Sequence, residues 1–389
     1  MLSFNDTQIA FHDKSDYELK KALWLFRTVR NPTLVNAGSS MLHVAMSLRL
    51  PVDWALKPTV FSHFCGGETI DDCDDTINRL GRSNIKTILD YSAEGKQTEE
   101  DFDYTRDQIL ATIEKARGNP LVPHAVFKVS GLARKALLEK VQAGHDRSEK
   151  EQQEFERIKQ RIDTICAAGF HAGVPVMIDA EESWIQEVVD KMVEAMILKY
   201  NTQKPLIYHT LQMYRHDRLE YLGEFIKKAR EEDRYPAFKL VRGAYMEKER
   251  DRAEELDMPS PIYPNKKATD QAFDTATRMC LDKYQEVGLC IGTHNELSSA
   301  RAADIMEKKA IPKNHDNIWF SQLLGMSDHI SYKLAHLGFN VCKYVPYGPV
   351  KTVVPYLIRR AQENTSVAGQ TSRELQLLED EVKRRRLAD

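Results

Sequence analysis

The fold class predicted by this 389-residue sequence is a (β/α)8 barrel, and two observations predict it. Short apolar runs alternate with longer helical patterns, which is typical of βα units with buried parallel strands. The runs number eight, as this barrel requires: Ile85–Tyr91, Ala125–Ser130, Val174–Asp179, Leu206–Leu211, Phe238–Val241, Leu289–Thr293, Ile318–Leu323 and Val341–Val345. A doubly wound sheet is the alternative, but no GxGxxG motif follows the first run.

Helix-like segments precede and separate the strand candidates. Asp16–Val29 and Leu34–Leu48 carry apolar stripes at helical spacing, and Pro51 then interrupts the pattern. Thr98 stands before acidic residues, which predicts the N-cap of a helix at Glu99–Arg117. Further helices are predicted at Glu68–Leu80, Glu181–Tyr200 and Leu297–Lys308, and the charged segment Gly144–Ile162 is interpreted as a solvated helix.

These patterns divide the chain into three parts. Residues 1–84 form an N-terminal helical region, residues 85–366 the barrel, and residues 367–389 a C-terminal surface helix. In that last helix Leu375, Leu378 and Val382 lie at helical spacing, and a basic run follows. A solvated face is the preferred interpretation of the basic run, and contact with an anionic membrane is the alternative.

Composition excludes several classes of function. The net charge is −3 and no basic stripe with interleaved aromatic residues is present, so we expect no nucleic-acid partner. No apolar run approaches the ~20 residues of a membrane span, and the first residues look like neither a secretory signal nor a transit peptide. The six cysteines are scattered and the twelve histidines include no HExxH motif. We therefore expect a reducing compartment and no metal site.

Polar residues stand at the carboxyl ends of the predicted strands, where barrel enzymes have their active sites. Each alone has an ordinary explanation, such as a helix cap or a satisfied core histidine. Their occurrence at one end of seven strands favours a functional site instead. A buried lysine also needs a carboxylate or a bound anion nearby. The residues are Asp90, Lys128, Asp179, Gln212, Lys239, His294 and Tyr344.

A helix-like segment near the C-terminus follows a predicted Pro-Tyr-Gly-Pro turn at 346–349. It carries Tyr356, Arg359, Arg360 and Glu363 at i, i+3, i+4 and i+7, which places them on one face. Two guanidinium groups beside an aromatic ring suit a small carboxylate. A solvated helix face with an ion pair between Arg359 and Glu363 is the alternative.

An ordered set of motifs resembles the proline dehydrogenase family, most closely its monofunctional, mitochondrial-type branch. The resemblance covers about residues 60–366 and rests on LDYSAE at 89–94, FKVSG at 127–131, MIDAEE at 177–182, KLVRGAY at 239–245, GTHN at 292–295, QLLGM at 322–326, and KYVPYGPV with YLIRRAQEN across 343–364. It implies a distorted TIM-type barrel with its last helix over the barrel mouth. It also implies FAD as cofactor and oxidation of L-proline to Δ1-pyrroline-5-carboxylate by hydride transfer to flavin N5. A membrane quinone would then take the electrons, which implies transient peripheral membrane contact.

The resemblance also implies roles for individual residues. Asp179 and Lys239 are catalytic, beside the flavin and at its reactive edge. Glu94 is a gate that pairs with an arginine of the last helix. Substrate binding falls to Lys128, Leu240, Tyr344, Tyr356, Arg359 and Arg360. The flavin contacts are Ala180, Gln212, Val241, Arg242, Gly243, Tyr245, Thr293, His294 and Asn295, and Glu363 either joins them or orients an arginine.

Two positions bear on function within this resemblance. Many bacterial members have Arg where this chain has Lys239, whereas the mitochondrial-type branch has Lys. A hydroxyproline-using branch has Ser at the position of Tyr344, so we expect proline as substrate and keep hydroxyproline as the first alternative. A Schiff-base lyase using Lys128 or Lys239 is the second alternative, and a non-enzymatic helical scaffold the third. We expect a cytoplasmic protein, peripheral on the inner face of a bacterial inner membrane, or else a processed mitochondrial protein. The sequence predicts no oligomeric state.

Overall fold

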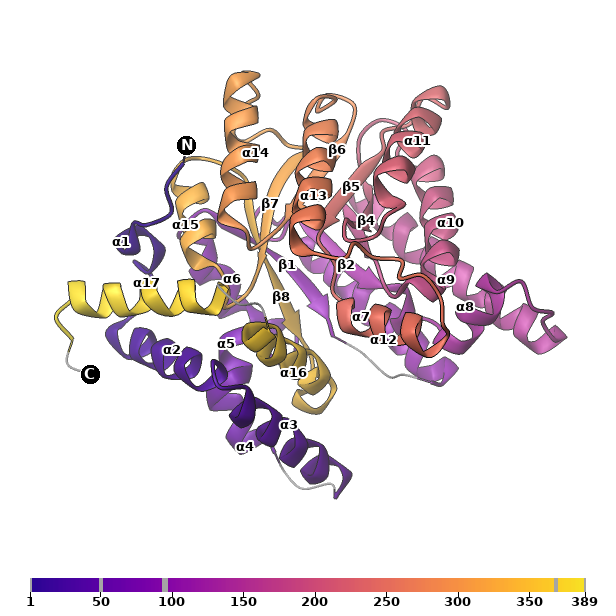
Figure 1. Ribbon diagram of the computed structural model, residues 1–389. Helices are drawn as coiled ribbons and strands as arrows, with labels where there is room; N and C mark the ends of the chain where they lie inside the picture. The colour runs from indigo at the N-terminus through magenta and orange to yellow at the C-terminus, as the bar shows by residue number, and fades with distance from the viewer. Residues whose placement is uncertain (1, 49–51, 93–96, 367–369, 388–389) are drawn as a thin grey trace. The chain divides into compact units, whose positions relative to one another are not determined.

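Eight parallel strands form a closed barrel in the order β1 to β8, which confirms the predicted fold class (Figure 1). The computed structural model describes residues 2–48, 52–92, 97–366 and 370–387. The strands are β1 (Ile85–Tyr91), β2 (His124–Lys128), β3 (Val176–Asp179), β4 (Ile207–Gln212), β5 (Ala237–Val241), β6 (Gly288–Gly292), β7 (Ile318–Leu323) and β8 (Val341–Tyr347). Most of their side chains are buried, as expected for parallel strands covered by helices.

The predicted strands match the observed ones within two residues at each end, and β1 and β7 match at both ends. The turn predicted at 346–349 begins too early, because β8 continues through Pro346 to Tyr347. The carbonyl of Pro346 accepts from Gly66 N at 2.9 Å, and the carbonyl of Tyr347 accepts from Ser92 N at 3.0 Å. Proline has no N–H to satisfy, so it can extend this strand while its carbonyl is bonded.

One compact unit contains most of residues 88–321. Its helices are α7 (Glu99–Ala116), α8 (Lys135–Gln142), α9 (Glu149–Ala172), α10 (Ser183–Tyr200), α11 (Arg218–Glu231), α12 (Met246–Glu255), α13 (Lys266–Leu281) and α14 (Glu296–Lys308). Thr98 caps α7 as predicted, since its hydroxyl accepts from Asp101 N. The charged segment predicted from Gly144 begins as a helix only at Glu149, after a capping box at Ser148, and buries one face through Phe155, Ile158 and Ile162.

The second compact unit gathers the N-terminal segments up to Thr87 and the segments from Gln322 onward. This division differs from the three predicted parts. Its helices are α1 (Thr7–Ala10), α2 (Asp16–Val29), α3 (Pro32–Ser47), α4 (Asp53–Leu56), α5 (Ser62–Phe64), α6 (Asp74–Gly81), α15 (Asp328–His336), α16 (Val350–Ser366) and α17 (Gln370–Arg384).

The C-terminal helix α17 belongs to the core of this unit. Leu375, Leu378 and Val382 are each at most 5% exposed and join the apolar cluster that also holds residues of α2 and α16. α17 lies along α2 (Figure 1). The predicted apolar stripe therefore exists, but it is buried within the unit, and two of the basic residues after it, Arg384 and Arg385, pair with Glu381.

Three further features concern chemistry. No helix in the described ranges is both long enough and apolar enough to cross a membrane. Among the same residues, no three His, Cys, Asp or Glu side chains gather in a way that could hold a metal ion. The six cysteines are buried free thiols.

Candidate functional site

Five residues of the barrel form one layer of side chains in the β2–β6 part of the sheet. The register pairs Lys128 with Asp179, Thr210 with Lys239, and Lys239 with Cys290. Side chains alternate along a strand, so partners in one layer project to the same face of the sheet. The two predicted lysines and the predicted aspartate are therefore brought together, as the sequence suggested.

Asp179 is the centre of this layer. Its Oδ1 pairs with Lys239 Nζ and accepts from Thr210 Oγ1 at 3.3 Å, and its Oδ2 lies 3.6 Å from Lys128 Nζ. Lys128 Nζ also lies 3.5 Å from Asp90 Oδ2. Lys239 is 5% exposed and Asp179 8% exposed, whereas Lys128 is half-buried. The buried lysine has the carboxylate partner that burial demands.

The positive charge of Lys239 affects the pKa of two neighbouring side chains. Burial, together with the positive charge of Lys239, lowers the pKa of His124 to about 3. Burial also raises the pKa of the Cys290 thiol to about 12, an effect that Lys239 reduces and Asp179 increases. Cys290 is thus a protonated, buried thiol at neutral pH, with no nucleophilic thiolate to offer. The charged groups of this layer that could act on a ligand are the two lysines and the carboxylates.

The segment after β3 carries a residue that the sequence analysis missed. Glu181 is 1% exposed, and its Oε1 accepts from Ser130 N at 2.7 Å. Its own N–H donates to Gln186 Oε1 at 2.7 Å. Burial raises the pKa of Glu181, against the lowering effect of Lys135. These bonds also explain why α10 begins at Ser183 and not at the predicted Glu181.

Gln212, predicted as a flavin contact, bonds main-chain groups on two sides. Its Nε2 donates to the carbonyl of Glu181 at 2.7 Å, and its Oε1 accepts from Ala244 N at 2.9 Å. The ends of β3, β4 and β5 are thereby joined. Gly243 lies in this joined segment with φ +146°, and a Cβ there would stand 2.4 Å from the Tyr214 ring. Only glycine fits this backbone without strain.

Arg242 is held by Thr293, directly after β6, and by residues of α13 and α14. Its Nε donates to Asp270 at 2.7 Å, and its terminal nitrogens donate to Thr293 Oγ1 at 2.5 Å and Ser298 Oγ at 2.8 Å. The guanidinium also stacks over the Phe273 ring, 4.5 Å from the centroid. A planar cation is fixed in one orientation beside Thr293, which was predicted to contact the flavin.

The remaining predicted flavin contacts of the first unit lie in or shortly after strands β3, β5 and β6. Asn295 caps α14, its side chain accepting from Ser298 N at 3.0 Å. Ala180 is buried directly after β3, and the carbonyl of Val241 accepts from Met213 N at 2.8 Å. His294 and Tyr245 are half-buried in the segments after β6 and β5.

Leu240 is not brought to the face of Lys239. The register pairs Leu240 with Leu211 and Ile291, and all three are fully buried. Because neighbouring residues of a strand project to opposite faces, Leu240 lies on the other side of the sheet from Lys239. Its predicted contact with a substrate ring finds no support in this register.

The second unit holds the remaining predicted residues. Tyr344, in β8, is 7% exposed, and Leu324 N donates to its carbonyl at 2.9 Å. In α16, Tyr356 and Arg360 are buried, Arg359 is half-buried, and the Arg360 guanidinium lies 5.2 Å from the Tyr356 ring centroid. The contact agrees with the predicted i, i+4 spacing of Tyr356 and Arg360, and the binding of a carboxylate by this face stays a prediction. Glu94 and the side chain of Glu363 lie outside the described residues, and the place of α16 over the barrel mouth stays a prediction.

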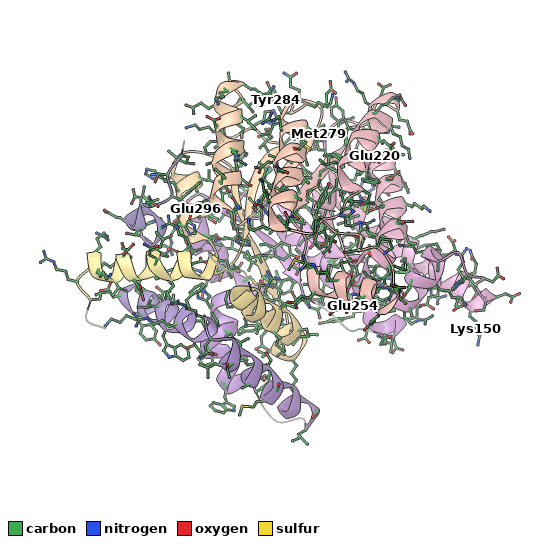
Figure 2. All side chains as sticks on the ribbon, in the orientation of Figure 1. Lys150, Glu220, Glu254, Met279, Tyr284 and Glu296 are labelled. Atoms are coloured by element: carbon green, nitrogen blue, oxygen red, sulfur yellow. The ribbon has the colours of Figure 1, made fainter. Side chains whose placement is uncertain are left out.

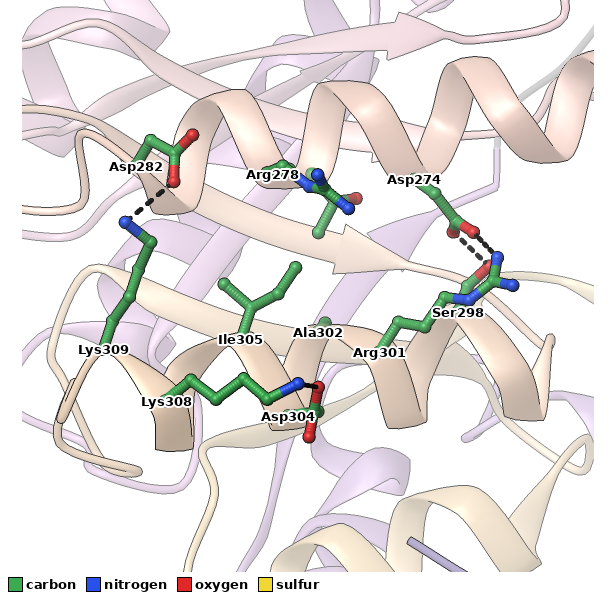
Figure 3. A pocket seen from close by; sticks show the side chains of 11 residues that line it. Asp274, Arg278, Asp282, Ser298, Arg301, Ala302, Asp304, Ile305, Lys308 and Lys309 are labelled. Atoms are coloured by element: carbon green, nitrogen blue, oxygen red, sulfur yellow. Dashed lines mark hydrogen bonds and ion pairs between the residues drawn. The ribbon is translucent and has the colours of Figure 1, made fainter. Parts of the chain in front are cut away.

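A surface pocket of about 360 Å³ lies between α13 and α14 (Figure 3). Its charged side chains are largely paired with each other. Asp274 accepts from Ser298 and pairs with Arg301, and Lys309 pairs with Asp282 at 2.9 Å. Ser298 links this pocket to Arg242, but the lysine–aspartate layer of the barrel is not part of it. We do not regard the pocket as the substrate site.

Comparison with known proteins identifies the family. The family described as proline dehydrogenase matches residues 73–373. This chain belongs to the proline dehydrogenase family. Its relatives include proline dehydrogenase 1, mitochondrial, of Dictyostelium discoideum, which is 30% identical over 98% of this chain and 74% of the relative. Hydroxyproline dehydrogenase of Xenopus laevis is also 30% identical, over 99% of this chain and 90% of the relative.

Solved structures agree with the fold. Proline utilization A from Bdellovibrio bacteriovorus superposes with a TM-score of 0.71 at 19% identity, over 94% of this chain. This chain spans 37% of the length of that protein. At this identity the likeness concerns the barrel fold alone. Within the proline dehydrogenase family, this chain is an oxidoreductase with a closed barrel and charged residues at its strand ends.

Proposed function

We propose that this chain oxidises L-proline to Δ1-pyrroline-5-carboxylate with FAD as cofactor. Family membership supports the reaction, and the observation that carries the site is the layer in which Lys128 and Lys239 both approach Asp179. A Schiff-base lyase would need one of these lysines as a neutral nucleophile. Lys239 instead pairs with Asp179 in the barrel interior, so its nitrogen is engaged by a carboxylate.

The residues at these strand ends fit a flavin. Two lysines and a fixed arginine provide positive charge beside a glycine segment whose packing excludes a side chain. When bound, FAD would accept a hydride from the carbon next to the proline nitrogen and so supply the redox chemistry. We propose that its contacts are Ala180, Gln212, Val241, Arg242, Gly243, Tyr245, Thr293, His294 and Asn295, with Glu363 as a further candidate.

The protein's own charges favour the reactive form of the substrate. Hydride loss requires the neutral amine, because its lone pair forms the new C=N bond. Lys128 and Lys239 oppose a second cation close by, whereas Asp90 and Asp179 favour one, so we propose that the substrate nitrogen lies nearer the lysines, where the pKa of its ammonium form is lowered. Lys239 also stabilises negative charge that develops next to it during the reaction. Asp179 holds both lysines in place for these roles.

Substrate recognition is proposed to rest on a carboxylate clamp. Arg359 and Arg360 supply two guanidinium groups on one face of α16, and Lys128 adds a third cation. Fork-shaped donors bind a carboxylate with two parallel hydrogen bonds and so fix the orientation of the ring. Tyr344 and Tyr356 are proposed to wall the ring, and Glu94 to close the site.

Oxidation of 4-hydroxyproline is the second candidate, because the Xenopus laevis relative carries that name. Tyr344 is the residue that separates the two substrates in our proposal, since its ring leaves less room for a hydroxyl group. Replacing Tyr344 with Ser should shift the ratio of kcat/KM toward hydroxyproline. An unchanged ratio would show that Tyr344 does not wall the ring.

The electron acceptor and location are also proposals. A membrane quinone would reoxidise the flavin, which requires at least transient contact with a membrane. Two locations fit this acceptor: the inner face of a bacterial inner membrane and, as for the relative from Dictyostelium discoideum, the mitochondrion.

One experiment tests cofactor and substrate together. The purified protein should show a flavin absorption band near ~450 nm. Anaerobic L-proline should bleach this band, while glycine at the same concentration should not. A colourless protein that cannot be reconstituted with FAD would refute the proposal, and bleaching by hydroxyproline in preference to proline would favour the second candidate.

A further inference from the structure

Large apolar side chains are exposed together in the N-terminal helices. Six of them lie between residues 17 and 54 and are 54% to 78% exposed: Tyr17, Trp24, Leu34, Met41, Leu48 and Trp54. Single exposed apolar residues are ordinary on a protein surface, whereas several on helices that contact each other suggest an interaction surface. All six belong to the second compact unit.

Helix α2 presents an ordered outer face. Tyr17, Lys20, Trp24 and Arg27 are exposed and stand at i, i+3, i+7 and i+10, which places them along one side of the helix. The opposite side is buried through Leu19, Leu23, Leu25, Phe26 and Val29. The buried side of α2 packs into the core without Tyr17 and Trp24. These two aromatic side chains are exposed on the other side of the helix.

Helix α3 contacts α2 and has an outer face of a different kind (Figure 1). Between Pro32 and Ser47 it contains no Lys, Arg, Asp or Glu, in a chain with 29% charged residues. Leu34 and Met41 are seven residues apart on its exposed side, and Leu48 continues the same line in the turn that follows. A helix that faces water normally carries charged residues there, so this side of α3 is suited to an apolar environment.

Basic residues outnumber acidic ones around this face, although exposed Asp16 and Glu18 flank Tyr17 and Arg27 pairs with Glu379 of α17. From Leu19 to Val52 the sequence contains five Lys or Arg residues and no Asp or Glu, although the chain as a whole has a net charge of −3. Lys20 and Arg30 are exposed. Tryptophan and tyrosine favour the boundary between water and lipid, and basic residues favour anionic headgroups. Apolar residues framed by basic ones are the composition of helices that lie in a membrane surface.

We propose that the outer face of α2 and α3, formed by Tyr17, Lys20, Trp24, Leu34, Met41 and Leu48, docks on a bilayer containing anionic lipid. The docking is peripheral. Its purpose rests on the proposed function, because it brings the enzyme to a quinone dissolved in the bilayer. A second copy of the chain is the less suitable occupant, since a two-fold contact through this face would oppose basic residues to basic residues.

The test measures co-sedimentation of the full chain with vesicles. Phosphatidylcholine vesicles are compared with vesicles that also contain phosphatidylglycerol, and wild type should bind the second kind more tightly. The double variant Trp24→Gln/Met41→Gln should bind the anionic vesicles about tenfold more weakly. The variant Lys20→Gln/Arg30→Gln should lose most of the preference for anionic lipid.

Matched controls use exposed residues elsewhere. Leu256 and Met258 are 53% and 60% exposed in the first unit, so Leu256→Gln/Met258→Gln removes the same kind of surface. Lys150 projects from the outer end of α9 (Figure 2), and Lys150→Gln/Lys227→Gln removes two exposed cations. Neither control should change vesicle binding. All variants should keep the wild-type rate of proline oxidation with a water-soluble dye.

The outcomes separate this proposal from the proposed function. Equal vesicle binding by wild type and both surface variants would overturn the docking face, whatever the dye assay shows. Dissociation of a wild-type dimer by Trp24→Gln/Met41→Gln, with vesicle binding unchanged, would also overturn it and identify a protein interface. Absence of proline oxidation with the dye would refute the proposed function, but selective loss of vesicle binding would still support the docking face.

Discussion

Lys239 and Asp179 form an ion pair that joins β5 to β3 across the intervening strand β4. Thr210 of β4 donates to the same carboxylate at 3.3 Å. Two strands that do not pair with each other are therefore connected through their inward side chains. The pair is buried, so its two members depend on each other far more than the members of a surface ion pair do.

Replacing Asp179 with Asn should damage both stability and activity. The change leaves Lys239 buried without its counter-charge, and removing one partner of a buried pair costs about 3 kcal/mol of unfolding free energy. We also expect kcat/KM for proline to fall at least ~100-fold, because Lys128 and Lys239 lose the group that positions them. Urea unfolding and steady-state kinetics measure the two effects.

The double variant Asp179→Asn/Lys239→Met is the matched control. Removing both charges should recover much of the lost stability, since no uncompensated cation remains. Activity should stay low. If Asp179→Asn is as stable as wild type, Lys239 does not depend on this carboxylate in the folded protein.

Glu181 should act on proline binding through Lys128. Its side chain accepts from Ser130 N, two residues after Lys128, while its main-chain groups bond Gln186 and Gln212. Glu181→Ala removes the first of these bonds, together with the ion pair between Glu181 and Lys135 at 3.8 Å, and keeps the two main-chain bonds. We expect KM for proline to rise about tenfold with kcat and flavin content nearly unchanged, because the lysine is displaced relative to the substrate.

Two comparisons distinguish positioning from simple packing. Glu181→Gln keeps an oxygen acceptor for Ser130 N and should restore KM. In a Lys128→Ala background, Glu181→Ala should have no further effect on KM, because its effect passes through Lys128. Additive effects in the double variant would disprove this role.

Gly243→Ala should weaken flavin binding and lower the melting temperature. The added Cβ would stand 2.4 Å from the Tyr214 ring, at a φ of +146° that other residues rarely adopt. Strain and overpacking of this kind cost about 2 kcal/mol each. Gly338→Ala is the control, since that glycine has φ +89° with no atom near the added Cβ. It reports backbone strain alone, and equal losses of flavin in both variants would refute the role of the packing against Tyr214.

The strands and the central charged residues were predictable from sequence because both follow local rules. Buried parallel strands appear as short apolar runs, and Lys128, Asp179 and Lys239 are exceptions within or at the end of such runs. The predicted contact of Leu240 with the substrate ring did not take the alternation of side chains along a strand into account. Strand alternation, read from Lys239, would have placed Leu240 on the opposite face.

Other features depend on contacts between distant residues. Glu181 bonds a main-chain N–H 51 residues away, and no periodic pattern reveals such a partner. The available signal was a second carboxylate directly after a strand that already ended in one. Residues of α2 and α17 likewise share one core although they are separated by most of the chain. That packing could not be read from the apolar spacing of either helix.

Arg359→Met and Arg360→Met should raise KM for proline and leave the flavin bound. Each change removes a charge-assisted hydrogen-bond donor worth about 1.5–3 kcal/mol, which corresponds to roughly a 10- to 100-fold change in binding. Steady-state kinetics and the flavin absorption of the purified variants measure the two properties. Lys351→Met is the control, because Lys351 is exposed on the same helix. Loss of flavin with unchanged proline affinity would show that these arginines serve the cofactor.

The stability of the second unit should depend on pH through Glu374. Burial, with the negative charge of Asp328, raises the pKa of Glu374 to about 8, while Ser327 N still donates to its Oε1. Between the ordinary carboxyl pKa and pH 8, the folded protein holds a proton that the unfolded chain has released. Stability should therefore fall as pH rises through this window, by about 1.4 kcal/mol per pH unit.

Glu374→Gln should flatten this slope between about pH 6.5 and 8, because the amide keeps the acceptor for Ser327 N but cannot ionise. Asp380→Asn, an exposed change on the same helix, should leave the slope unchanged. His63 gives stability the opposite dependence on pH. Burial, together with the charge of Lys14, lowers its pKa to about 4, so stability should also fall as pH drops below the ordinary histidine pKa. The two effects oppose each other between about pH 4.5 and 6.5, so urea unfolding of the wild type should show the fall in stability mainly between about pH 6.5 and 8. An unchanged slope there in Glu374→Gln would mean that Glu374 is ionised in the folded protein.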